Sequence, residues 1–91
     1  MKPPGRPAIV LMTHRIGRIL GRFSELKSEI QETALRDARF RGLCEDYETA
    51  TEALEFWTRS SDPRRLKLIS DYRNLVADLE AEIFALVRGA P

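Results

Sequence analysis

The residues that most often carry enzyme chemistry are scarce in this 91-residue chain. It has one histidine, His14, and one cysteine, Cys44, and 30 positions separate them. A nucleophile and its base must lie within hydrogen-bonding reach, and nothing in the pattern brings these two together. Neither has partners at metal-ligand spacing, so we expect no metal, no cofactor and no catalytic residue. The sequence therefore predicts a protein that is not an enzyme and has no small-molecule substrate.

Carboxylates are numerous in the middle of the chain and recur at helical spacing. Di-metal sites in helix bundles combine glutamates with Glu-x-x-His pairs, and this region has no histidine. We therefore expect these side chains to form a solvated helix face. They are Glu29, Glu32, Glu45, Asp46, Glu48, Glu52 and Glu55.

Two basic clusters could bind anions. Arg15, Arg18 and Arg22 are spaced by three and four residues, which places them on one helix face and suits nucleic acid or an anionic membrane surface. Pairing with carboxylates of the same chain is the favoured alternative, because the net charge is only +1, with −5 over residues 25–62. The second cluster spans 64–67; we expect it to be solvated or to meet the acidic middle of another chain.

An apolar stripe predicts the elements that position these groups. After an unstructured lead-in over 1–12, with Met12 as an alternative start, we expect helix over 13–59, with Thr13 as its N-cap. The stripe continues in one of two phases. Unbroken, it reads Thr33, Asp37, Phe40, Cys44, Tyr47, Thr51 and Leu54; reset near Asp37, it reads Phe40, Leu43, Tyr47, Ala50, Leu54 and Trp57. The second is more apolar, which indicates a shift of register around 33–37, but Ala34, Leu35, Arg36 and Ala38 favour helix. We therefore expect helix through this stretch, with a kink or short interruption as the alternative.

The clearest boundary is the turn at 60–62. Asp62 is a strong N-cap and Pro63 suits a first helical position, which predicts a last helix over 63–88. A short linker between long helices implies antiparallel neighbours. We therefore predict an all-α fold: an antiparallel helical hairpin with an additional N-terminal helical segment, completed as a multi-helix bundle by oligomerisation.

The apolar residues predicted to face each other form an interaction seam. Its members are Phe40, Leu43, Tyr47, Leu54, Trp57, Ile69, Tyr72, Val76, Leu79, Ile83 and Leu86. Two helices alone leave part of such a broad apolar stripe exposed to solvent, so we expect a homo-oligomer, with a dimer favoured. The function expected is a non-catalytic protein–protein interaction or regulatory module. The alternatives are an anion binder using the N-terminal arginines and a small protein that is stable only with a different protein partner.

Part of the chain resembles a known family. The string from Asp37 to Tyr47 resembles the D-x-x-F-x-x-L-x-x-[DE]-Y pattern of the YdcH-like family, small bacterial helical-hairpin proteins of uncharacterised function. The stretch from Leu68 to Leu86 is similar to that family's closing helix, so the resemblance spans about 35–88. It implies a hairpin and brings no catalytic residue. One cysteine and no long apolar run indicate a cytoplasmic protein.

Overall fold

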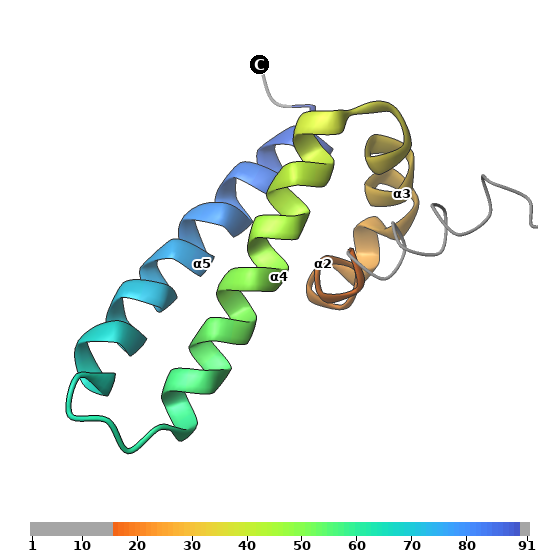
Figure 1. The fold of residues 1–91 in the computed structure, drawn as a ribbon. Helices are drawn as coiled ribbons and strands as arrows, with labels where there is room; N and C mark the ends of the chain where they lie inside the picture. The colour runs from red at the N-terminus through yellow and green to blue at the C-terminus, as the bar shows by residue number, and fades with distance from the viewer. Residues whose placement is uncertain (1–15, 90–91) are drawn as a thin grey trace, which may run out of the picture.

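Two long antiparallel helices form the body of the structure, a computed structural model that describes residues 16–89 (Figure 1). Helix α4 spans Ala38–Arg59 and helix α5 spans Arg65–Val87. A shorter arm precedes them, made of α2 (Gly17–Arg22), the 3-10 turn η1 (Ser24–Leu26) and α3 (Lys27–Arg36). No strand occurs between residues 16 and 89. The predicted all-α fold with an antiparallel hairpin is confirmed.

Asp37 separates the arm from the hairpin. Its backbone is extended (φ −127°, ψ 107°). Its carboxylate accepts hydrogen bonds from the backbone N–H groups of Arg39 (2.9 Å) and Phe40 (3.2 Å). These bonds satisfy two of the donors that a helix start leaves open. The helix is therefore interrupted at Asp37, within the stretch 33–37 where the sequence predicted a continuing helix with a kink or short interruption as the alternative. The buried residues of α4 combine the two phases of the stripe: Cys44 belongs to the unbroken phase, Ala50 to the reset one, and Phe40 and Tyr47 to both.

A second break occurs at Phe23, inside the stretch expected to be one helix. Phe23 has φ −123° and ψ 58°, outside the helical region, and α2 is only 6 residues long. Folding back here lets Ile16 and Ile19 become buried against the rest of the chain, at 3% and 0% exposure. Burial of those two side chains outweighs the helix propensity of this short segment. The predicted lead-in over 1–12 and the N-cap at Thr13 lie outside the described residues.

The turn between α4 and α5 is built by Asp62. Its carboxylate accepts a backbone hydrogen bond from Arg64 at 2.8 Å and pairs with the same residue's guanidinium at 3.0 Å. Ser60 Oγ accepts the N–H of Asp62 at 3.0 Å. Helix α5 consequently starts at Arg65, two residues later than predicted, and ends at Val87.

Asp62 makes this turn sensitive to acid. The hydrogen bonds from the Arg64 side chain and then from its backbone lower the pKa of Asp62 from 3.8 to about 2. Because the folded pKa lies below the unfolded one, its stabilising effect is complete above about pH 5 and is lost as the pH falls towards about 2. We expect the difference in thermal midpoint between wild type and Asp62→Asn to be constant above about pH 5 and to shrink below it. A difference that persists undiminished at about pH 2 would contradict this role of the charge.

The core lies where the arm meets the hairpin. Ten apolar residues are buried there: Ile16, Ile19, Ile30, Ala34, Phe40, Cys44, Tyr47, Ala50, Leu79 and Ile83. Helices α2 and α3 both contact α4, and α3 also contacts α5. None of the residues between 51 and 78 is buried. The arm reaches the turn half of the hairpin through Arg18, which pairs with Glu55, and the hairpin extends past the arm towards the turn (Figure 1).

Candidate interaction surface

The predicted interaction seam lies at the contact between the two long helices. Each of its eleven residues is buried or half-buried in the chain. Phe40 and Ile83 are fully buried, and the seam residues Leu43, Tyr72, Val76 and Leu86 pack against the core. Most of this seam is therefore used to join α4 to α5 within the chain, and its half-buried members near the turn keep part of their surface open to solvent.

Arg18 fastens the arm to α4. Its Nε lies 3.0 Å from Glu48 Oε1, and its Nη1 lies 2.8 Å from Glu55 Oε2. Its backbone N–H also donates to Glu48 Oε2 at 3.0 Å. The hydrogen bond and charge of Arg18 lower the pKa of Glu55, and Glu55 in turn raises the pKa of Arg18. This cation is thus already neutralised within the chain.

Arg22 fastens the arm to α5 through a shared carboxylate oxygen. Glu80 Oε2 accepts from Arg22 Nε at 3.2 Å and from the Tyr47 hydroxyl at 2.7 Å. Burial, and then the hydrogen bond to Glu80, raise the pKa of Tyr47 well above its usual range. The tyrosine therefore stays a neutral donor that links α4 to α5.

The basic face predicted from the N-terminal arginines is accordingly engaged with the hairpin. Arg18 and Arg22 both pair with carboxylates of α4 or α5, while Arg15 lies outside the described residues. A cation already in a bidentate or shared ion pair offers less to a phosphate than a free one. The ion pairs of Arg18 and Arg22 therefore favour the alternative in which these arginines pair with carboxylates of the same chain over the one in which they bind an anion.

Cys44 is fully buried at the centre of the core. Burial, and then the charge of Glu48, raise the pKa of its thiol to about 12. Since the thiolate is the reactive form, this thiol is a poor nucleophile. His14 lies outside the described residues, and within 16–89 no three metal-binding side chains come together.

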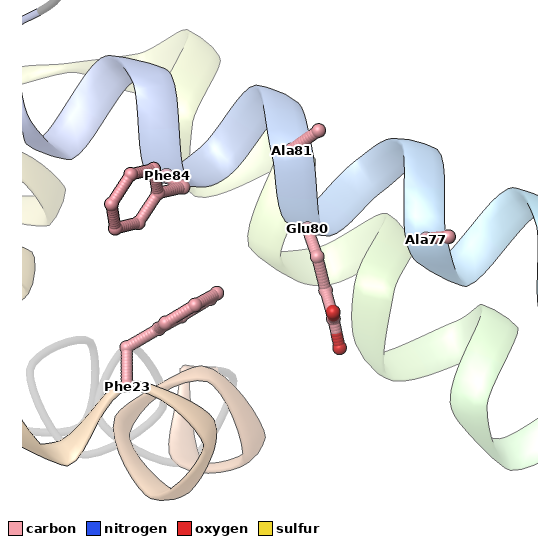
Figure 2. Close-up of a pocket in the computed structure, with 5 residues that line it drawn as sticks. All are labelled: Phe23, Ala77, Glu80, Ala81 and Phe84. Atoms are coloured by element: carbon pink, nitrogen blue, oxygen red, sulfur yellow. The ribbon is translucent and has the colours of Figure 1, made fainter.

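A groove between the arm and α5 is mainly apolar. Figure 2 shows Phe23 and Phe84 on either side of it, with Glu80 extending from α5 towards the arm; the ring centroids lie 5.7 Å apart. The Glu80 carboxylate is already bonded to Arg22 and Tyr47, so it offers little to a ligand. This groove is best explained as the packing contact of the arm.

The turn half of the hairpin, residues 51–78, carries the most exposed large apolar side chains of the two long helices. Leu66 is 72% exposed, Phe56 62% and Leu75 43%. Phe56 meets Trp57 edge to face at 5.2 Å, and Arg64 lies over the Trp57 ring at 5.6 Å. In the single chain the Phe56 ring remains largely open to solvent, whereas Trp57 is half-buried.

A shallow groove lies next to this exposed region. Its lining residues come from both long helices: Asp46, Thr49, Ala50, Tyr72, Leu75 and Leu79. Helix periodicity places Asp46 and Thr49 on the side of α4 away from Glu48 and Glu55, which face the arm. The groove therefore opens on the face of the hairpin opposite the arm.

Sequence reasoning did not single out Phe56 or Leu66. The signal was present at Phe56, because two adjacent aromatic residues point about 100° apart on a helix and cannot both enter one seam. Trp57 takes the half-buried position and Phe56 the exposed one. Leu66 follows the turn directly, where no periodic pattern yet defines a face.

Comparisons with family models, with curated proteins and with solved structures gave no match to this chain.

Proposed function

We propose that this chain is a non-catalytic helical protein–protein interaction module that associates with a second copy of itself. The turn half of the hairpin carries this proposal. It contains several large apolar residues and no buried one. They are Leu54, Phe56, Trp57, Leu66, Leu68, Ile69, Tyr72, Leu75 and Val76.

Burial of such side chains is the main force available for association. Covering apolar surface contributes about 25 cal/mol per Å², and aromatic side chains offer the largest areas. A helix pair can bury only the sides that face each other, so the outer sides need further helices. A second copy supplies them with closed two-fold symmetry, the commonest form of oligomer.

The absence of a chemical role is part of the proposal. It is supported by the buried thiol of Cys44, whose raised pKa disfavours nucleophilic attack. A reducing compartment such as the cytoplasm suits a single unpaired cysteine. None of the helices described for this chain is long and apolar enough to cross a bilayer. We also propose membership of the YdcH-like family, supported by the Asp37-x-x-Phe40-x-x-Leu43 motif at the start of α4.

Thermal unfolding at several protein concentrations tests self-association. A folded dimer that unfolds to single chains is stabilised by mass action, so its midpoint rises with concentration. We expect the midpoint to increase by several degrees between about 2 µM and about 200 µM chain. A midpoint independent of concentration over this range would contradict the proposal.

A further inference from the structure

The face of the hairpin opposite the arm has the form of a self-complementary interface. We call it the back face and define it by Thr49 and Trp57 on α4 and by Leu68, Leu75 and Asp78 on α5. Glu80 and Phe84 mark the opposite side of α5, since they contact the arm. Positions 68, 75 and 78 lie on the other side by helix periodicity. Contact with the arm therefore leaves the back face available.

The back face has a groove at one end and a ridge at the other. The groove lies between the middle turns of the two helices and includes Thr49, Ala50 and Leu75. The ridge lies nearer the turn, where Phe56 is 62% exposed and packs edge to face on Trp57. A surface that carries both shapes can receive its own copy, which is what a two-fold interface requires.

We propose that two copies pair back face to back face in antiparallel orientation, with α4 over α4 and α5 over α5. This inference rests on the proposed self-association and names its surface. The two-fold axis passes near Ala53 on α4 and Tyr72 on α5. Trp57 and Ala50 lie four and three residues from Ala53 on opposite sides, or about 5 Å each way. Each ridge then enters the partner copy's groove.

Charge fixes the antiparallel orientation. Lys67, Arg64 and Arg65 make the turn end of the hairpin basic, whereas Asp46 and Asp78 lie at the groove end. Within the chain Arg64 pairs with Asp62, and Lys67 pairs with Asp71 at 3.1 Å. The Lys67 side chain is nevertheless 80% exposed, and such a surface pair can be exchanged for another carboxylate at little cost. An antiparallel pairing about Tyr72 places Lys67, five residues before the axis, against Asp78 of the other copy, six residues after it. A parallel pairing would instead bring the two basic turns together, which opposes association. Opposite charges therefore meet twice in the proposed dimer.

A charge exchange tests this pairing. Asp78→Lys and Lys67→Glu each place like charges at two symmetric contacts, and we expect each to raise the dimer dissociation constant about tenfold at low salt. The double variant restores opposite charges, so its dissociation constant should return to within about threefold of wild type. Glu25→Lys, on η1 and away from the back face, makes the same charge change as Asp78→Lys and should leave the dissociation constant unchanged. If the dissociation constant of the double variant rises by the product of the two single-variant increases, residues 67 and 78 do not meet and the pairing is wrong.

Cysteine cross-linking tests the position of the axis. Ala53→Cys should form a disulfide-linked dimer with oxidised glutathione, because residue 53 lies beside its own copy near the axis. Leu66→Cys is the matched control: it is exposed on the arm side of α5 and should stay largely uncross-linked. If the wild-type chain is a dimer, but Ala53→Cys does not cross-link and the double charge variant does not regain the wild-type dissociation constant, the back-face pairing is wrong and self-association still stands. A wild-type monomer overturns both this pairing and the proposed function.

Discussion

Replacing Phe40 with alanine should cost about 3–5 kcal/mol of unfolding free energy. Phe40 is fully buried, and its backbone N–H donates to the Asp37 cap at 3.2 Å. The ring lies at the start of α4, in the core that joins the arm to both long helices. Truncation would leave a cavity that these short elements cannot easily close. Domains of this size are stabilised by about 5–15 kcal/mol in total, so the Phe40 ring contributes a large part of the free energy of unfolding.

Urea and thermal unfolding at one fixed protein concentration measure this effect. We expect the thermal midpoint of Phe40→Ala to fall by more than about 10 °C. Phe84→Ala is the matched control, because Phe84 is 42% exposed and its ring contacts Phe23 at 5.7 Å. It should cost about 1 kcal/mol. Equal losses for the two variants would mean that the core is not centred on Phe40.

The second large effect is expected on association. Leu75 is 43% exposed in the single chain and lines the groove of the back face. Leu75→Glu should therefore leave each chain folded but bury two unpaired charges in the proposed dimer. Burying an unpaired charge at the centre of an interface costs about 2 kcal/mol or more, which corresponds to at least a 30-fold rise in the dissociation constant.

Leu66→Glu is the matched control for this substitution. Leu66 is more exposed than Leu75, at 72%, and helix periodicity places it on the same side of α5 as Phe84, which faces the arm. We expect Leu66→Glu to retain the wild-type dissociation constant. Circular dichroism at fixed concentration checks that both variants keep their helix content. If Leu66→Glu raises the dissociation constant and Leu75→Glu does not, the interface lies on the arm side of the hairpin and not on the back face.

The hairpin was accessible from the sequence because its signals are local. Asp62 and Pro63 give a turn with a definite chemical cause, and the seam on either side keeps a regular period. The structure shifts the start of α5 by two residues because Asp62 binds Arg64 twice. The spacing of apolar residues does not predict hydrogen bonds of this kind at the start of a helix.

The arm was harder to predict, because its apolar stripe fits both a long straight helix and a folded-back one. The choice depends on contacts between residues far apart in the sequence, such as Arg18 with Glu48 and Arg22 with Glu80. Asp37 favours the break, but an aspartate preceded by good helix formers also occurs inside helices. For the same reason the sequence could not show which sides of the hairpin the arm would leave uncovered.

Sedimentation equilibrium of the wild-type chain is the most direct test of self-association. The chain has a mass of 10.4 kDa. At tens of micromolar chain we expect a fitted mass of twice that value, falling towards the single-chain mass as the protein is diluted. If the fitted mass is that of one chain at every concentration up to about 200 µM, with the helix content intact, the chain does not self-associate as proposed.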